Sequence, residues 1–224
     1  MLMAGPERSL MEQRELDRFA AAGMLAPVLF VVVFTFEGAL RAGYDPMGMY
    51  VSELALGERG WIQIVSFLLT GILIFVFGHG LRKCDKDTVP SKAGPVALQI
   101  IGGGFAVSGL FPTDSSAMFT QRSQQGTVHA IIGAVVFSLM PVACLTFFRS
   151  ARKEPQWRGF ARGSLAAGVL IIIGIGLLKT SEFPDADLFA WKGLLQRIIL
   201  LSFMTWLFVL AAKVRRMIYI PDRS

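Results

Sequence analysis

Long apolar segments separated by short polar ones run along the whole chain. Six of them are uninterrupted or nearly so, at about residues 19–40, 61–81, 94–111, 127–148, 163–178 and 193–212. As α-helices that rise about 1.5 Å per residue, segments of these lengths cross roughly 30 Å of hydrocarbon. The pattern predicts an all-α protein, a polytopic transmembrane bundle of six helices, with polar tails at residues 1–18 and 213–224.

Composition supports this fold class. Apolar residues make up 54% of the 224 residues and charged residues only 17%, against about 25% charged residues in soluble domains. A soluble enzyme, a disordered chain and a disulfide scaffold are therefore excluded. The two cysteines, Cys84 and Cys144, fall toward the side that we expect to be cytoplasmic, so no structural disulfide is expected.

The basic residues between the segments predict the orientation. Of the 22 Lys and Arg residues, 16 lie in or next to the two tails and the second and fourth loops, and 6 lie in or next to the other three loops. Short cytoplasmic loops carry the excess of Lys and Arg, so both termini are expected to be cytoplasmic. The net charge of +6 is thus explained by topology, and no nucleic-acid partner is expected.

The first apolar segment could instead be a signal peptide. It is longer than the apolar core of a signal peptide, which has about 7–15 residues, so we expect it to remain as a span.

The first outer loop carries signals for a short helix. Asp45 followed by Pro46 is typical of a helix N-terminus, and Gly57 is typical of the residue just past a helix end. We expect a short interfacial helix between them, lying on or dipping into the outer leaflet. Ser52 and Glu53 would then either line a pocket under this helix or form its solvated face.

Polar and ionisable residues gather at the expected outer ends of the spans. Asp114 follows the third span and His129 begins the fourth, and a carboxylate beside an imidazole orients it for general acid–base work. The two are therefore candidate catalytic residues, although each could simply cap or anchor a helix end. Glu37, Gln196 and Arg197 are candidate ligand-binding residues, together with Ser52 and Glu53. Arg197 could extend to the lipid headgroups, or pair with Glu37, Asp114 or a bound anion.

Several classes of site are excluded. The two histidines, His79 and His129, fall near opposite ends of their spans, so they cannot share a haem or a zinc ion. The chain has no Walker A motif, no GxGxxG after a strand and no GxSxG. We therefore expect no metal and no cofactor.

Small residues in the third and fifth spans predict close helix packing. Gly102, Gly103 and Gly104 are consecutive, and Gly159 and Gly163 are four residues apart. Small side chains let helices approach closely in lipid. The run of three glycines could alternatively leave an irregular segment beside a cavity.

The chain resembles the domain of unknown function 998 family of bacterial and archaeal integral membrane proteins, over about residues 20–212. The matching elements are Tyr44-x-Pro46, Ser52-Glu53-Leu54-x-Leu56-Gly57, Gly109-x-Phe111-Pro112-x-Asp114, His129 and Gly193-x-x-Gln196-Arg197. The resemblance implies six helices in a bacterial or archaeal cytoplasmic membrane. It implies no established activity.

Three functions fit these residues. The first is a binding or transport protein with an outward-facing polar pocket for a small anion or a lipid headgroup. The second is an enzyme that processes a lipid or isoprenoid at the outer leaflet with Asp114 and His129 as its acid–base pair. The third is a structural or assembly subunit, whose polar cluster only joins helices. In each case membrane lipids are expected partners, and the oligomeric state is left open.

Overall fold

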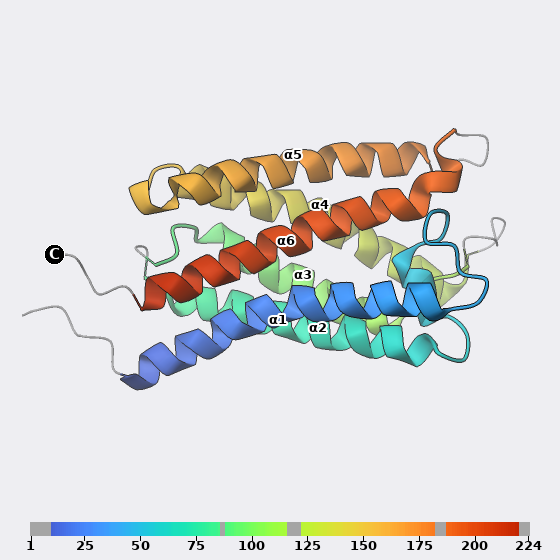
Figure 1. Ribbon diagram of the computed structural model, residues 1–224, viewed down its shortest axis with the longest axis horizontal. Coiled ribbons are helices and arrows are strands. Elements are labelled where there is room, and N and C mark those ends of the chain that lie inside the picture. The colour runs from blue at the N-terminus through green and yellow to red at the C-terminus, as the bar shows by residue number, and fades with distance from the viewer. Residues whose placement is uncertain (1–9, 86–87, 116–121, 182–186, 220–224) are drawn as a thin grey trace, which may run out of the picture.

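The computed structural model describes residues 10–85, 88–115, 122–181 and 187–219. The predicted tails lie partly outside the described residues, at 1–9 and 220–224. The described chain forms six long helices and three short 3-10 turns, shown in Figure 1: α1 (Leu10–Leu40), η1 (Val51–Ala55), α2 (Gly60–Lys83), α3 (Ala93–Leu110), α4 (Gln124–Ala151), η2 (Pro155–Trp157), α5 (Arg158–Thr180), η3 (Phe189–Trp191) and α6 (Lys192–Ile218).

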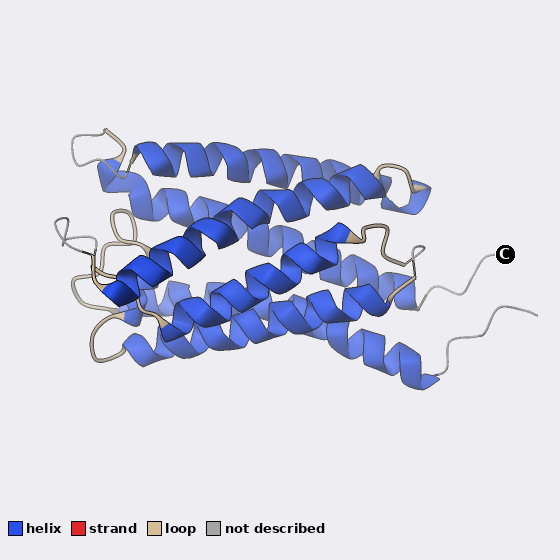
Figure 2. Ribbon diagram, turned by 180° about the vertical axis from the view of Figure 1, so that it is seen from behind, coloured by secondary structure: helices blue, strands red, loops and turns tan. Residues whose placement is uncertain are grey.

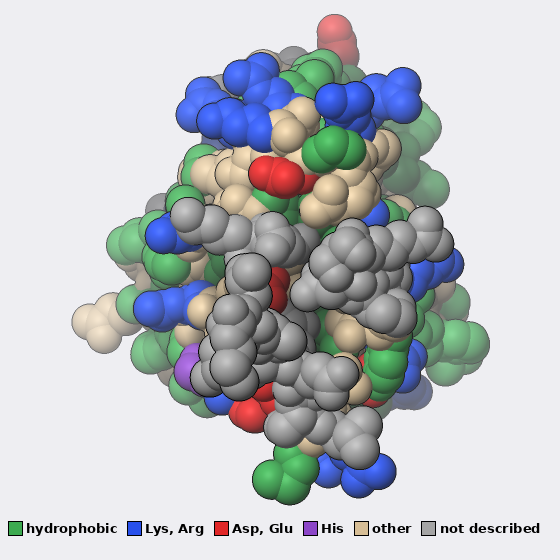
Figure 3. Space-filling model, turned by 90° about the vertical axis from the view of Figure 1, so that its left-hand side faces the viewer, with side chains coloured by type: hydrophobic (Ala, Val, Ile, Leu, Met, Phe, Trp, Pro, Cys, Tyr) green, Lys and Arg blue, Asp and Glu red, His purple; other side chains and the backbone are tan. Residues whose placement is uncertain are grey.

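The helices run roughly along the long axis of the molecule, with loops at both ends (Figures 1 and 2). Each packs mainly against its neighbours in sequence, and α6 closes the bundle by packing against α1. The start of α1 and the end of α6 lie at the same end, which we call the basic end (Figure 1). Figure 3 looks onto this end, where Lys and Arg side chains gather around the rim. We call the opposite end the distal end.

All six helices are long and apolar enough to span a membrane. Large apolar side chains face outward on them, such as Phe36, Trp61 and Ile131, each more than 60% exposed. In water such exposure would be costly, whereas in a bilayer these side chains contact lipid. The six-helix prediction is confirmed, and the chain is a multi-pass membrane protein.

Several helices extend beyond the predicted apolar segments at the basic end. α1 begins at Leu10 rather than near Phe19, and α6 ends at Ile218 rather than near Ala212. Ion pairs join these extensions to their neighbours. Lys83 binds Glu15 at 2.6 Å and Arg215 binds Asp17 at 2.7 Å.

Glycines allow α2 and α3 to pack closely. A Cβ atom on Gly102 would lie 2.6 Å from the Phe75 nitrogen, and one on Gly71 would lie 2.5 Å from the Gly102 oxygen. Gly104 faces Val136 of α4. The expectation of close packing is wrong for Gly103, where an added Cβ atom would meet nothing within 4 Å. Successive residues of a helix point about 100° apart, so three consecutive glycines cannot share one face.

The first distal loop differs most from its prediction. In place of an interfacial helix of about three turns, it contains only the 3-10 turn η1, all of whose residues are buried. The Asp45 carboxylate accepts hydrogen bonds from the backbone N–H groups of Met47 and Gly48, both at 2.9 Å, which makes a turn there. Val51 and Leu54 are each 1% exposed, so this loop packs into the mouth of the bundle instead of lying on the leaflet.

Candidate functional site

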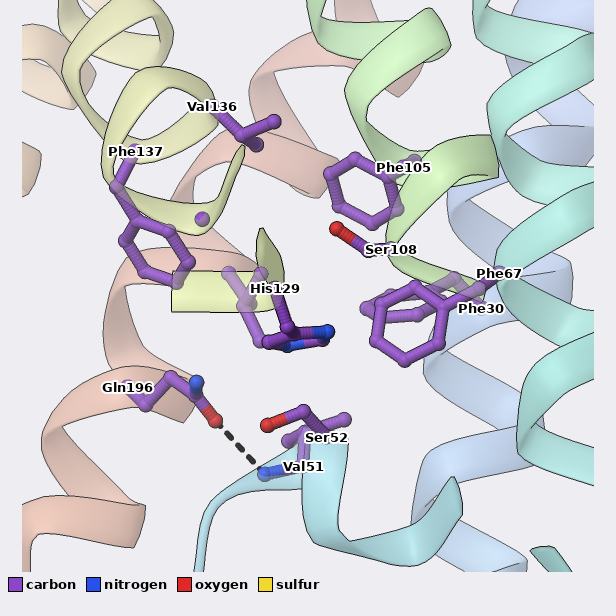
Figure 4. A pocket seen from close by; sticks show the side chains of 12 residues that line it. Phe30, Val51, Ser52, Phe67, Phe105, Ser108, His129, Val136, Phe137 and Gln196 are labelled. Carbon is purple, nitrogen blue, oxygen red and sulfur yellow. Dashed lines mark hydrogen bonds between the residues drawn. The ribbon is translucent and has the colours of Figure 1, made fainter. Parts of the chain in front are cut away.

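A small cavity of about 40 Å³ lies under η1 at the distal end of the bundle (Figure 4). Every long helix except α5 contributes to its wall. The lining residues are Phe30, Val51, Ser52, Phe67, Phe105, Ser108, His129, Gly133, Val136, Phe137, Gln196 and Leu200. The rings of Phe30, Phe67 and Phe105 form a mutual cluster, with centroids 5.2–5.9 Å apart, on one side of the cavity. The polar side chains therefore face a rigid aromatic surface.

The imidazole of His129 stands in the middle of this site. Its ring lies edge-on to Phe67, with centroids 6.4 Å apart. Its Nδ1 atom lies 2.8 Å from the Phe111 carbonyl oxygen. Because a carbonyl can only accept, Nδ1 must carry the hydrogen, and in the neutral ring Nε2 keeps the lone pair. The C-terminal end of α3 thereby sets both the orientation and the tautomer of His129.

Three further polar side chains line the cavity as hydrogen-bond donors. The Oε1 atom of Gln196 accepts from the Val51 N–H at 2.7 Å, so its amide nitrogen remains available to donate (Figure 4). Ser52 and Ser108 are both buried, and both line the cavity. Buried polar groups are normally paired. The two serine hydroxyls are therefore placed to bind water or a ligand in the cavity.

Asp114 positions the start of α4. Its Oδ2 atom accepts from the Ser123 N–H at 2.9 Å, and Ser123 in turn caps α4 by accepting from the Gly126 N–H at 2.9 Å. Gly126 leaves room for this contact, since a Cβ atom there would overlap the Asp114 carboxylate. The hydrogen bond of His129 goes to a backbone carbonyl rather than to Asp114. A catalytic role for the pair stays a prediction.

Arg197 holds the first distal loop in place. Its Nη1 atom donates to the carbonyl oxygens of Pro46 at 2.6 Å and of Met49 and Gly193, both at 3.0 Å. Its Nη2 atom donates to the Tyr44 hydroxyl. No carboxylate among the described residues pairs with Arg197. The guanidinium has five donors in a fixed fork, which suits a loop whose carbonyls lack helical partners.

Tyr44 extends this network to η1. Its hydroxyl donates to the Tyr50 carbonyl at 3.0 Å, and its ring lies 5.5 Å from the Arg197 guanidinium. Burial raises the pKa of the Tyr44 phenol. The phenol therefore keeps its proton and its role as a donor across the physiological range.

The beginning of α6 forms the seat for this loop. A Cβ atom on Gly193 would lie 2.3 Å from the Met49 oxygen, so only glycine permits the loop to approach this closely. The Leu194 N–H donates to the Met47 carbonyl at 3.0 Å. Gly193, Gln196 and Arg197, which the sequence shows as one motif, thus all dock the loop that roofs the cavity.

The two remaining candidates have partners outside the cavity lining. Glu37 pairs with Arg59 at 2.6 Å across the distal ends of α1 and α2. The Glu53 Oε1 atom accepts from the Tyr50 N–H at 2.9 Å, which closes the start of η1. The backbone carbonyl of Glu53 accepts from Arg41 at 3.2 Å.

The structure therefore brings Ser52, His129 and Gln196 together in one cavity. The other four candidates bind the segments that form this cavity: Asp114, Arg197, Glu37 and Glu53.

Sequence reasoning missed the contribution of Ser108 and of the aromatic rings. Ser108 carried a weak signal as one of the two polar residues, with Gln99, of an apolar span. The phenylalanines carried none, because they are common on every face of a membrane helix.

No group of three His, Cys, Asp or Glu side chains that could hold a metal ion occurs in the described part of the chain. The cavity offers hydroxyls, one amide and one imidazole. This set suits hydrogen bonding better than coordination of a hard cation, which prefers several carboxylate and carbonyl oxygens.

Comparison with curated proteins and with solved structures finds no match. The protein family described as "Protein of unknown function (DUF998)" matches residues 24–213. The match includes α2 to α5, most of α1 and α6, and every residue that lines the cavity. The resemblance found in the sequence is thereby confirmed, and the chain belongs to the DUF998 family of proteins of unknown function.

Proposed function

We propose that this protein binds a small anion, or the anionic head of a lipid, in the cavity under η1. The observation that supports this most is the donor set of Ser52, Ser108 and Gln196 around the imidazole of His129. No Asp or Glu is among the residues that line the cavity. A site with several donors and no carboxylate favours a ligand rich in acceptors, such as a phosphate group.

The volume of the cavity limits the ligand. About 40 Å³ suits a water molecule or one small polar group. A phosphate-sized group enters when the η1 roof shifts. No long helix holds this roof: Arg41 donates to the Leu54 carbonyl, the Gln196 side-chain oxygen accepts from the Val51 N–H, and Arg197 holds the loop that leads into η1. The ligand charge is offset by His129 in its protonated form, so binding tightens as the pH falls through the titration of that histidine.

A thermal-shift experiment on the purified full-length protein in detergent tests this proposal. Inorganic phosphate and a short-chain phosphatidic acid are compared as the free and the lipid-borne form of the same group. We expect ligand-dependent stabilisation that increases as the pH is lowered from about 8 to about 5, because a protonated imidazole offsets the ligand charge. The form that gives the larger shift identifies the source of the anion.

Variants assign the effect to the cavity. Ser52→Ala removes one hydrogen bond to a charged ligand, which is worth about 1.5–3 kcal/mol, so affinity should fall by about tenfold or more. His129→Gln should abolish the pH dependence. Thr146→Val is the matched control, because it removes a hydroxyl from the basic end of the same helix as His129, where Thr146 donates to the Ala143 carbonyl. Equal shifts in all variants, or no shift with either probe, would contradict the proposal.

A second candidate function is acid–base catalysis on a lipid at the same site. It is favoured by the fixed tautomer of His129, whose Nε2 keeps a lone pair, and by the Ser52 hydroxyl in the same cavity. This function predicts turnover of a membrane lipid pool that is lost in His129→Ala while the protein still folds. Binding without turnover would leave the first function as the explanation.

A further inference from the structure

A second and much larger hollow lies at the other end of the molecule, in the groove between α5 and α6. Its volume is about 900 Å³. Its α5 side is formed by small and apolar residues that include Gly159, Gly163 and Ala167, and its α6 side includes Trp206 and Val209. The groove continues to the last turns of α6, which end at the basic end of the bundle (Figure 1).

The glycines of this groove are not used for packing within the chain. Farther along α5, a Cβ atom on Gly168 would contact Leu145 and Cys144 of α4, and one on Gly174 would contact Ile199 of α6. An added Cβ atom on Gly159 or Gly163 would meet nothing within 4 Å. The sequence-based expectation of close packing within the bundle is therefore wrong for these two glycines. They deepen the groove on the outside of the helix bundle instead.

Two basic side chains stand at one end of the groove. Lys213 and Arg216 are three residues apart on α6, so they lie on neighbouring positions of one helix face, and both line the groove. The Lys213 Nζ atom lies 4.9 Å from the centroid of the Trp157 ring, which fixes its stem at the edge of the bundle. None of the described residues that line the groove is Asp or Glu. The groove thus has an apolar body and a cationic end.

We propose that this groove binds one anionic phospholipid. Its phosphate contacts Lys213 and Arg216, and an acyl chain lies along Gly159, Gly163 and Ala167. Basic pockets between transmembrane helices are suited to anionic headgroups, and an apolar groove beside them accommodates the attached chain. This site is distinct from the cavity under η1, which lies at the opposite end of the bundle and has no Lys or Arg in its lining.

Charge favours a lipid over a second copy of the chain as the occupant. Two copies related by a two-fold axis along the membrane normal would place the same patch of each against the other. Lys213 and Arg216 of one copy would then face the same two cations of its partner across a groove without carboxylates. The negative charge of a phosphate group is instead attracted to both cations.

Native mass spectrometry of the full-length protein released from detergent tests the proposal. Phosphatidylglycerol and phosphatidylcholine with identical acyl chains are added separately, so that only the headgroup charge differs. We expect phosphatidylglycerol to be retained preferentially. The double substitution Lys213→Gln and Arg216→Gln should weaken its retention by about fivefold for each charge removed, as expected for basic residues near a lipid surface.

Matched variants separate the groove from general effects. Arg149→Gln with Lys153→Gln removes two exposed charges outside the groove lining and should leave retention unchanged. Gly163→Leu fills the groove and should reduce retention. Gly176→Leu is its control, because Gly176 is also in open space on α5 but outside the groove lining. An added Cβ atom meets nothing within 4 Å at either glycine, so both variants are expected to fold.

Two results would overturn the proposal. One is equal retention of the two lipids, or retention that does not change in the variant lacking Lys213 and Arg216. The other is a dimer that dissociates in Gly163→Leu, which would make a second copy the occupant. The loss of phosphatidylglycerol retention in the variant lacking Lys213 and Arg216 is measured with the cavity under η1 intact, so the outcome here is independent of the ligand proposed for that cavity.

Discussion

Single glycine residues decide how closely α2 and α3 pack, and neighbouring glycines differ completely in this respect. Gly102 faces the backbone of α2, while Gly103 faces open space. The sequence predicts that this span is rich in close contacts, but it does not predict which glycine makes them. Membrane helices are apolar on every face, so the periodicity that marks the buried side of a soluble helix is weak here.

The two positions make a matched pair of substitutions. Gly102→Ala places a Cβ atom 2.6 Å from the Phe75 nitrogen and must push α2 and α3 apart, which should cost about 1–3 kcal/mol. Gly103→Ala adds the same atom where nothing lies within 4 Å, and alanine is the better helix former. Thermal melts in detergent should therefore show a lower melting temperature for Gly102→Ala alone. Equal melting temperatures would mean that α2 and α3 do not pack through Gly102.

The same scale explains which site residues could be predicted. Polar residues are costly in a membrane span, so His129, Gln196 and Arg197 could be recognised as candidates from their positions alone. Their partners were not recognisable, because Arg197 binds backbone carbonyls of residues far away in the sequence. A backbone carbonyl exists at every residue, so no sequence pattern identifies the one that a side chain will bind.

Among the elements, η1 depends most on contacts from outside its own segment. Asp45-Pro46 and Gly57 are local helix signals, and Gly57 does adopt a positive φ of 73°. The intervening residues nevertheless form only a 3-10 turn, because Arg41 and Gln196 bind backbone groups of η1 and Arg197 binds the Met49 carbonyl just before it. Local propensity is a weak guide where distant side chains satisfy the backbone. The roof of the cavity is thus built by tertiary contacts.

This dependence predicts the effect of changing Arg197. Arg197→Gln and Arg197→Lys should both loosen the loop, because neither replacement reproduces a fork that reaches Pro46, Met49, Gly193 and Tyr44 together. We expect a loss of about 2–4 kcal/mol, since hydrogen bonds from a charged group are worth about 1.5–3 kcal/mol each and water replaces some of them. Limited proteolysis of residues 41–50 should be faster in both variants. Full protection in Arg197→Lys would show that its positive charge alone is sufficient.

At the scale of the whole molecule, six spans follow from apolar length, whereas the order of helix contacts does not. The closure of α6 against α1 joins segments from opposite ends of the chain. It requires complementary surfaces that one sequence does not reveal. This closure has a functional consequence, because it brings Gln196 and Arg197 of α6 to the loop that follows α1. The cavity under η1 exists only in the closed ring.

Orientation in the membrane is the remaining property of the whole molecule, and it determines which side of the membrane each site faces. The excess of Lys and Arg at the basic end predicts that this end is cytoplasmic. In a background without Cys84 and Cys144, cysteine is introduced at Met47, which is 45% exposed at the distal end, or at Lys153, which is exposed at the basic end. An impermeant thiol reagent should label the first in intact cells and the second only after permeabilisation. The reverse pattern would place the cavity under η1 on the cytoplasmic side and the α5–α6 groove in the outer leaflet, and the expected ligands of both would change accordingly.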